Sequence, residues 1–301
     1  MEIISFLGTE NFFLLLIPAL YWCVETSIGI RVAVILLLSA SVNDSLKMFF
    51  HDPRPYWYST EVIAYAKESS FGLPSGHAQI AFSVWGMLAN GIHKWWGWFF
   101  AILIILLIGI SRLYLGVHFP HDIIIGWLVG ALLLFLVVWS WKPVIEWLKK
   151  MSFRQQIIAS FLVSLAIILL YLTPFLWLKI TNWQPPSAWA EYASSAVSIK
   201  AAFTTAGILF GLLIGLVWLN NQGGFDTNGS LWKRVLRYML GLIGVIVFYI
   251  GLKVLFGLLV PDEEDLLHYI LRYARYVLVG AWISAGAPWF FIKLGLARRL
   301  A

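Results

Sequence analysis

Long runs of apolar residues, separated by short polar connections, repeat along almost the whole chain. Runs of this length predict helices that cross a bilayer, because about 20 apolar residues span the ~30 Å of hydrocarbon. We expect nine such helices, and because the first and third runs are short, a count of eight is the alternative. The approximate ranges are 12–24, 30–50, 78–92, 96–110, 123–141, 157–178, 199–219, 236–259 and 276–294. The predicted fold class is therefore all-α, a polytopic bundle of transmembrane helices.

Composition supports a membrane protein and argues against other classes. The 301 residues are 61% hydrophobic and 12% charged, whereas a soluble domain carries about 25% charged residues. The formal net charge is +6, but the cations lie in short connections and no basic stripe or recognition motif accompanies them, so nucleic-acid binding is not expected. Cys23 is the only cysteine, which excludes an intrachain disulfide.

Basic clusters in alternate connections predict the orientation. The clearest clusters lie at 142–154, 233–237 and 293–299. Under the positive-inside rule these connections are cytoplasmic, which places the N-terminus outside and the C-terminus inside. Residues 47–54, 74–77 and 111–122 then meet at the outer ends of spans two to five. No basic segment precedes the first span, so we expect it to be retained. The expected location is a bacterial inner (plasma) membrane, with the site facing outward.

The first polar motif is Lys47-x6-Arg54-Pro55. Lys47 and Arg54 are two helical turns apart and would share a face on a continuous helix. Pro53 and Pro55 predict that the helix ends here, which leaves Arg54 in a stiff turn. Taken alone, both cations fit a structural role, since cations at span ends often extend toward the headgroups.

The second motif, Pro74-Ser75-Gly76-His77, directly precedes an apolar run. Small residues at a helix start expose free backbone amides and the positive end of the helix dipole, which favours anion binding. Gly76 also lets a ligand approach the backbone closely. Taken alone, a helix cap with an incidental histidine is the simpler interpretation.

The third motif is Ser111-Arg112-x5-His118-x3-Asp122. His118 and Asp122 have the i, i+4 spacing that brings side chains together on a helix. A carboxylate on one imidazole nitrogen fixes the tautomer and leaves the other nitrogen as a base or nucleophile. A helix that begins only near Pro120, with Asp122 as a first-turn acid, is the structural alternative. Three cations with one carboxylate favour an anionic ligand, and two histidines favour chemistry on it.

Together, the three motifs resemble the three-part signature of the type 2 phosphatidic acid phosphatase and vanadium haloperoxidase superfamily, over roughly residues 30–135. The resemblance implies that His118 attacks phosphorus to form a phosphohistidine and that Asp122 orients it. It implies that His77 protonates the leaving oxygen and then activates water. The implied phosphate-binding residues are Lys47, Arg54, Ser75, Gly76 and Arg112. We expect no metal or cofactor, because three cations can neutralise a phosphomonoester and no carboxylate cluster for Mg²⁺ is evident.

The expected function is hydrolysis of a lipid phosphate or diphosphate at the non-cytoplasmic membrane face. Candidate substrates are polyprenyl diphosphate, phosphatidic acid, phosphatidylglycerol phosphate and a sphingoid phosphate. Residues 54–57 and 111–121 also look like glucose-6-phosphatase, which keeps a sugar phosphate as an alternative, although the 55–74 connection leaves little loop for a sugar pocket. A lipid phosphotransferase is a second alternative. A non-enzymatic transporter of anions or lipid phosphates is the alternative from another class.

The signature divides the chain unequally. We assign residues 1–150 to a phosphatase core with five spans, and residues 151–301 to additional transmembrane helices of unknown role. Shaping lipid access and forming a homodimer are two roles open to the second half. The expected partners are the lipid phosphate substrate and the bilayer.

Overall fold

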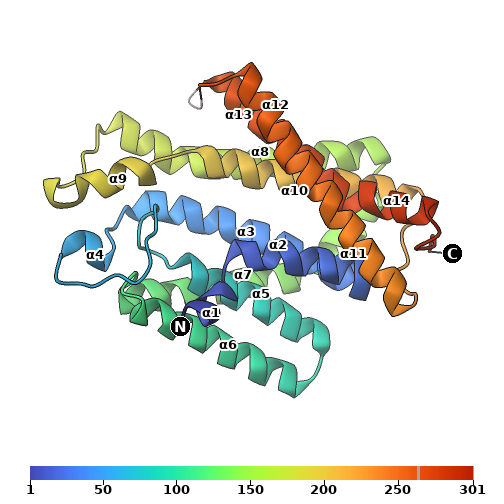
Figure 1. Ribbon diagram of the computed structural model, residues 1–301, viewed down its shortest axis with the longest axis horizontal. Coiled ribbons are helices and arrows are strands. Elements are labelled where there is room, and N and C mark those ends of the chain that lie inside the picture. Colours follow the sequence, from blue (N-terminus) through green and yellow to red (C-terminus); the bar gives the residue numbers. More distant parts are fainter. Residues whose placement is uncertain (263–264, 301) are drawn as a thin grey trace. The chain divides into compact units, whose positions relative to one another are not determined.

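A computed structural model of the protein describes residues 1–262 and 265–300, and all of its regular elements are helices (Figure 1). The only β-type pairing in this part of the chain is an isolated bridge between Asp226 and Arg298. The predicted all-α class is therefore confirmed for the described residues.

Seven helices of the described part are long and apolar enough to cross a membrane. They span Thr26–Tyr58, Trp95–Tyr114, Pro120–Lys149, Phe153–Ile180, Lys200–Asn221, Leu231–Leu259 and Leu266–Lys293. Two further predicted spans correspond to shorter apolar helices, Glu10–Val24 and Gly76–Ile92. The count of nine, its alternative of eight and the orientation of the termini stay predictions.

The chain forms two compact units that are interleaved along the sequence. Unit 1 comprises residues 1–14, 32–142 and 169–199, and unit 2 comprises 15–31, 143–168 and the residues from 200 onward. The three polar motifs all belong to unit 1. The division of the chain at residue 150 stays a prediction.

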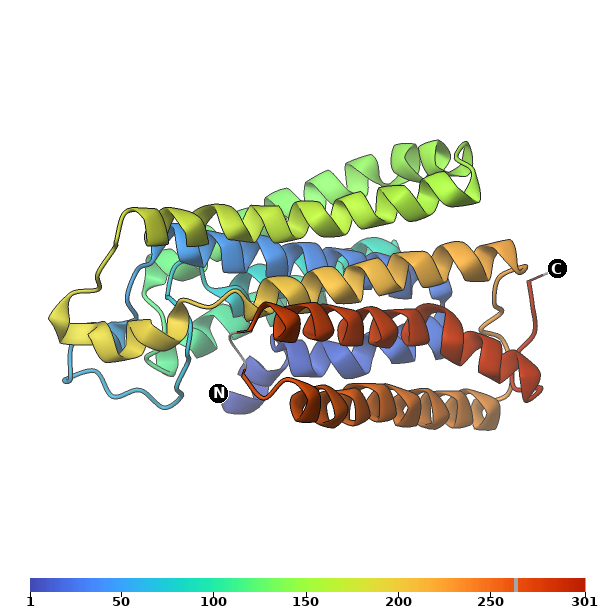
Figure 2. The ribbon, with the colours of Figure 1, turned by 90° about the horizontal axis from the view of Figure 1, so that it is seen from above.

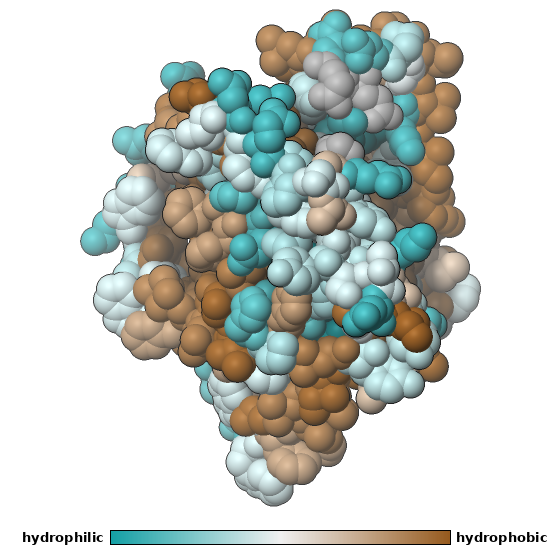
Figure 3. All heavy atoms as spheres, turned by 90° about the vertical axis from the view of Figure 1, so that its left-hand side faces the viewer, coloured by the Kyte–Doolittle hydropathy of each residue, from teal (hydrophilic) through white to brown (hydrophobic). Residues whose placement is uncertain are grey.

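Unit 1 contains the helices of the N-terminal half and the short helices around residue 190. They are α1 (Glu2–Phe6), α2 (Glu10–Ala19), α3 (Thr26–Phe50), α4 (Pro55–Tyr58), α5 (Gly76–Ile92), α6 (Trp95–Tyr114), α7 (Pro120–Lys149), α8 (Phe153–Ile180), η2 (Ser187–Trp189) and α9 (Ala190–Ala196). Four of them, α2, α3, α7 and α8, also contribute residues to unit 2. Around α4 and α9, hydrophilic and intermediate side chains are interspersed with hydrophobic ones (Figure 3).

Buried polar contacts hold α5 between α3 and α7. The Gln79 amide of α5 donates to the Ser39 carbonyl of α3 at 2.8 Å, and Asn43 donates to Gln79 Oε1 at 2.9 Å. On α7, a Cβ at Gly126 would lie 2.8 Å from the Ser75 carbonyl, so the close approach requires glycine there. The Ser75 amide donates to the Asp122 carbonyl at 3.0 Å. These contacts bring the second and third motifs side by side.

An apolar cluster joins α5 to α6. Ala81 of α5 and Ile105 and Ile108 of α6 are buried together. Burial of each isoleucine side chain contributes roughly 1.5–3 kcal/mol to the free energy of folding. The cluster therefore fixes α6, which carries Arg112 in its last turn.

Unit 2 is built mainly from the helices after residue 200. They are η1 (Leu20–Val24), α10 (Lys200–Asn221), α11 (Leu231–Ile246), η3 (Val247–Gly251), α12 (Leu252–Leu259), α13 (Leu266–Ala281), η4 (Trp282–Gly286) and α14 (Ala287–Lys293). Helices α10 and α13 run side by side (Figure 2). A Cβ at Gly207 would lie 2.7 Å from the Tyr273 carbonyl, so glycine permits this contact.

The last long helix starts before the predicted span. From the sequence we expect a helix start after Pro261 and a separate span from about residue 276. In the structure α13 starts at Leu266, where the Asp265 side chain accepts a hydrogen bond from the Leu267 amide at 2.7 Å, and it continues into the predicted span. The guanidinium groups of Arg272 and Arg275 lie 5.7 and 4.9 Å from the centre of the Tyr276 ring. Two cations stacked on an aromatic ring are tolerated inside the helix. They lower the local hydropathy, so hydropathy alone places the start of the span later than the start of the helix.

Candidate active site

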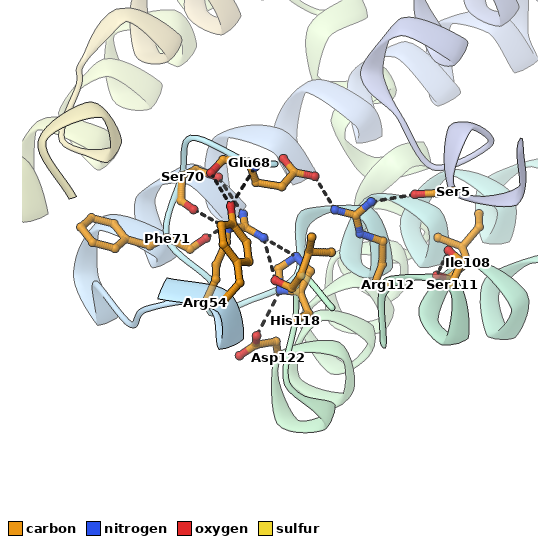
Figure 4. A network of polar contacts seen from close by, with 12 residues as sticks. Ser5, Arg54, Glu68, Ser70, Phe71, Ile108, Ser111, Arg112, His118 and Asp122 are labelled. Carbon is orange, nitrogen blue, oxygen red and sulfur yellow. Dashed lines mark hydrogen bonds and ion pairs between the residues drawn. The ribbon is translucent and has the colours of Figure 1, made fainter. Parts of the chain in front are cut away.

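The His118–Asp122 pair lies at the start of α7, and both side chains are buried. Asp122 Oδ2 accepts hydrogen bonds from the Phe119 amide at 2.9 Å and from His118 Nδ1 at 3.1 Å (Figure 4). The other ring nitrogen, Nε2, lies 3.0 Å from Arg54 NH1. Because a guanidinium can only donate, Nε2 accepts this bond, and the ring proton is on Nδ1. The predicted pairing is present, with His118 just before the helix.

His118 is held as a neutral imidazole. Burial lowers its pKa well below the usual value for histidine, and the nearby cations, first Arg54 and then Lys47 and Arg112, lower it further. Both causes disfavour the charged form. Nε2 therefore keeps its lone pair at neutral pH, which is the state that a nucleophile requires.

Arg54 is fully buried in the turn between α3 and α4. Helix α3 ends at Phe50, so Arg54 does not share a helix face with Lys47. Its other donors bond to oxygens of two segments, the Ser70 carbonyl (2.7 Å), Ser70 Oγ (3.1 Å), the Phe71 carbonyl (3.2 Å) and the Val117 carbonyl (3.0 Å). None of these acceptors is a carboxylate. The positive charge of Arg54 is thus solvated by dipoles and remains available to an anion.

Lys47 reaches the same place from the last turn of α3. Its ammonium group donates to Ser70 Oγ at 2.7 Å, and Arg54 donates to the same oxygen. Ser70 belongs to the segment between α4 and α5, residues 59–75, here called the 59–75 loop. The two predicted cations therefore converge on one hydroxyl oxygen, although they do so across a turn.

Arg112 completes the set of three cations. Its side chain is buried, donates through NH1 to Ser5 Oγ at 2.7 Å, and forms an ion pair through NH2 with Glu68 of the 59–75 loop (Figure 4). Its Nε has no partner within the described residues. Burial acts to raise the pKa of Glu68, but Arg54, Arg112, His77 and Lys47 outweigh burial, so the pKa is lowered. Glu68 is therefore an anion beside three cations.

The second motif forms the start of α5. Ser75 precedes the helix, and its Oγ is buried without a hydrogen-bond partner in residues 1–262 and 265–300. A Cβ at Gly76 would lie 2.9 Å from Asn43 Oδ1, so a larger residue would displace that amide. His77, in the first turn, is half-buried. An unpaired buried hydroxyl next to free helix amides fits an anionic ligand.

A polar cavity of about 290 Å³ opens beside these residues. Three of the predicted site residues, Lys47, Gly76 and His77, line it, together with Glu68 and Ser70. Arg54 donates to Ser70 Oγ and Arg112 forms an ion pair with Glu68, so both arginines contact residues that line the cavity. The structure thus brings the residues of all three motifs into one arrangement.

Glu68 and Ser70 were missed by sequence reasoning. A signal existed, since Lys67-Glu68-Ser69-Ser70 is a polar run a few residues before the second motif. Nothing in the sequence shows, however, that this run folds back onto Arg54 and Arg112. In the described ranges, no three His, Cys, Asp or Glu side chains are grouped so that they could hold a metal ion.

Comparisons with known proteins agree on one family. The PAP2 superfamily profile matches residues 28–146, and the profile described as "PAP2 superfamily phosphatase, transmembrane extension" matches residues 203–299. Glucose-6-phosphatase 3 of Bos taurus is 26% identical over 95% of this chain and 87% of its own length. Phosphatidylglycerophosphatase B of Bacillus subtilis is 33% identical over 44% of this chain and 70% of its own length.

One solved structure is also similar. It is the crystal structure of a transmembrane PAP2 type phosphatidylglycerolphosphate phosphatase from Bacillus subtilis, with 31% sequence identity, 50% of this chain and 76% of that chain covered, and a TM-score of 0.40. The family matches and the relative that is 33% identical establish the family by sequence. The chain belongs to the PAP2 superfamily and is an integral membrane phosphatase that hydrolyses phosphoric monoesters.

Proposed function

We propose that the protein hydrolyses a lipid phosphate or diphosphate at the non-cytoplasmic face of the membrane, through a phosphohistidine on His118. The observation that carries this proposal is the environment of His118. Its Nδ1 donates to Asp122, and its Nε2 lone pair points toward the Arg54 guanidinium. A neutral, oriented imidazole beside three cations is suited to attack a phosphoryl group.

In the first half of the reaction, the Nε2 lone pair of His118 forms a bond to phosphorus. The bond between phosphorus and the leaving oxygen breaks, and that oxygen takes a proton from His77. Burial and the nearby cations lower the pKa of His77, so His77 carries this proton while the bound anionic phosphate offsets those cations. The proton on Nδ1 stays on the ring and remains hydrogen-bonded to Asp122. The Asp122 carboxylate stabilises the positive charge that develops on the phosphorylated ring. The dephosphorylated alcohol, or the lower phosphate of a diphosphate, then leaves.

In the second half, water attacks the phosphohistidine. Neutral His77 takes one proton from that water as its oxygen bonds to phosphorus, and the bond between phosphorus and Nε2 breaks. This step releases inorganic phosphate, returns His118 to its neutral form and leaves His77 protonated for the next cycle. The two histidines therefore alternate roles without any net change in the protein.

Lys47, Arg54 and Arg112 hold the phosphoryl oxygens, with the Ser75 hydroxyl and the Gly76 amide. Phosphoryl transfer depends mainly on positioning and on neutralising charge in the transition state. In the structure, Ser70 Oγ accepts from Lys47 and Arg54, and Glu68 pairs with Arg112. The phosphoryl oxygens of a substrate replace these two oxygen ligands, so the cations exchange one set of acceptors for another.

A sugar phosphate is the second candidate substrate, and two observations favour it. The similarity to glucose-6-phosphatase 3 extends over 95% of this chain. The cavity beside the site is lined mostly by polar side chains, whereas the short 55–74 connection predicted little room for a sugar pocket. A lipid phosphate, the first candidate, is supported by the similarity to phosphatidylglycerophosphatase B and by the position of the site at the ends of apolar helices.

The proposed function is tested by phosphate release from the purified protein in detergent. The panel contains the four lipid candidates and glucose 6-phosphate, each assayed with and without EDTA. We expect release from at least one lipid phosphate and no effect of EDTA, because cations of the chain neutralise the phosphoryl charge. Complete loss of activity in EDTA, restored by Mg²⁺, would contradict the mechanism, and release from glucose 6-phosphate alone would favour the second candidate.

Replacement of Glu68 by glutamine is expected to tighten the binding of vanadate and inorganic phosphate roughly three- to tenfold. The variant removes the anion that competes for Arg112, and a hydrogen bond to a charged group contributes about 1.5–3 kcal/mol at most. Glu61→Gln is the matched control, because Glu61 is an exposed glutamate of the same 59–75 loop. Inhibition constants in a phosphate-release assay measure the effect. Weaker binding in Glu68→Gln than in the control would mean that Glu68 supports the phosphate site and does not compete with the phosphate.

A further inference from the structure

Part of the wall of the polar cavity is formed by residues that the mechanism above does not use. This wall consists of Thr9, Glu10 and Asn11 at the start of α2, with Asn43 and Asp44 of α3. All five residues belong to unit 1, as the site does. Leaving groups of phosphoesters differ in whether they carry hydroxyl or ammonium donors, so the acceptors on this wall bear directly on which phosphoester fits.

Glu10 and Asp44 are the two carboxylates of this wall. Neither carboxylate forms a hydrogen bond or an ion pair within the part of the chain that the structure describes, and their charged neighbours are each other and Lys47. Lys47 is nine-tenths buried and uses one ammonium donor on Ser70. Asp44 is partly buried and Glu10 is exposed, so water or a ligand must supply the donors that these two carboxylates lack in the protein.

Glu10 and Asp44 line the same cavity as Lys47 and His77. Lys47 connects this cavity to the phosphate-binding residues through Ser70, which also accepts from Arg54. In the proposed reaction, which this inference rests on, His77 protonates the leaving oxygen. The leaving group that His77 protonates would then occupy the cavity that His77 lines, and Glu10 and Asp44 line that cavity too.

We propose that Glu10 and Asp44 bind the leaving group and select phosphoesters that carry hydrogen-bond donors, hydroxyl or ammonium groups, close to the ester oxygen. A site built to pair with polar groups rejects an analogue that lacks them, because the analogue displaces water from the acceptors of the site and offers no donor in its place. A second anionic group at this position is disfavoured as well, since like charges repel. The volume of about 290 Å³ is at the small end for ligand pockets, which fits a compact polar group.

This selectivity separates the candidate substrates. Phosphatidylglycerol phosphate, a sphingoid phosphate and a sugar phosphate all carry donors near the ester oxygen. Phosphatidic acid carries none, and the leaving group of a polyprenyl diphosphate is itself an anion. The first three are therefore the substrates that the wall accepts, and the last two are those that it rejects.

The test compares three soluble phosphates with similar ester oxygens. Glucose 6-phosphate carries hydroxyl groups, O-phosphoethanolamine carries an ammonium group, and hexyl phosphate carries no donor. The readout is the ratio of kcat/KM for each donor-bearing phosphate to kcat/KM for hexyl phosphate. We expect a ratio of at least about 10 for one of the two in the wild-type protein, and a loss of about tenfold in that ratio in Asp44→Asn or Glu10→Gln. Whichever phosphate gives the high ratio identifies the donor as hydroxyl or ammonium.

Glu61→Gln, which removes the same charge at an exposed position, is the matched control and should keep the wild-type ratio. Because the ratio is taken within one preparation, partial unfolding of a variant cancels. A wild-type ratio near 1 for both donor-bearing phosphates, or ratios that stay unchanged in both acid variants, would overturn the proposal.

Equilibrium binding of the same three phosphates to the His118→Ala protein gives the selectivity without turnover. If the wild-type protein releases no phosphate but this binding ratio is at least about 10 and falls in Asp44→Asn, the proposed reaction fails and the role of the wall stands. If phosphate is released through His118 without donor selectivity, the reaction stands and the role of the wall fails.

Discussion

Replacement of His118 by alanine is expected to lower phosphate release at least about 10⁴-fold, while the protein still binds vanadate. The change removes the nucleophile, and water is then the only group that can attack phosphorus. Residual activity from the cations alone is small but measurable, as in other enzymes that lose a nucleophile. Single-turnover assays with labelled phosphate, quenched in alkali to preserve a phosphohistidine, should show label on the wild-type protein and none on the variant.

His93→Asn is the control for this experiment. His93 is exposed and has a positive φ of 55°, a conformation that asparagine tolerates. The control removes an imidazole far along α5 from His77 and should keep full activity. An intermediate case is Asp122→Asn, for which we expect a loss of about 10²–10⁴-fold, because the amide can no longer hold the Nδ1 tautomer. If His118→Ala released phosphate at the wild-type rate, another group would be the nucleophile.

The helices were largely predictable because hydropathy acts locally. Every apolar run that we took as a span corresponds to helix, and the break before Arg54 was expected from its two prolines. The start of α13 was indicated by the acidic residues after Pro261, but hydropathy alone placed the membrane span later. Arg272 and Arg275 gain their partner, the Tyr276 ring, only once the chain is helical, and a hydropathy window counts them as isolated charges.

The site was predictable where fixed spacing brings residues together. His118 and Asp122 are four residues apart, and their hydrogen bond needs only the first turn of α7. Glu68 is different, since its contact with Arg112 links residues 44 positions apart. The return of the 59–75 loop depends on the buried Arg54, whose donors bind Ser70 and Phe71. Contacts between residues this far apart in the chain leave no periodic pattern in a single sequence.

The dual role of Arg54 leads to a second large expected effect. Arg54→Lys should lower kcat/KM by roughly 10³-fold and destabilise the protein by about 3 kcal/mol or more, even though the charge is kept. An ammonium group has three donors on a flexible stem and cannot reproduce the planar fork. Carbonyls of Ser70, Phe71 and Val117 now accept from Arg54, and a buried acceptor left unpaired costs about 1–3 kcal/mol.

The same substitution at Arg154, which is exposed at the start of α8, is the matched control and should change neither quantity. Thermal unfolding in detergent measures stability, and kcat/KM on the best substrate measures catalysis. The affinity for vanadate then separates the two roles of Arg54. Closure of the 59–75 loop needs its hydrogen-bond donors, whereas binding of the phosphoryl group needs both its donors and its positive charge. Because lysine keeps the charge, the affinity for vanadate should fall by less than about tenfold, while kcat/KM falls far more. Equal losses in both would mean that Arg54 acts on the phosphoryl group alone, and that the hydrogen bonds to the 59–75 loop do not position His118.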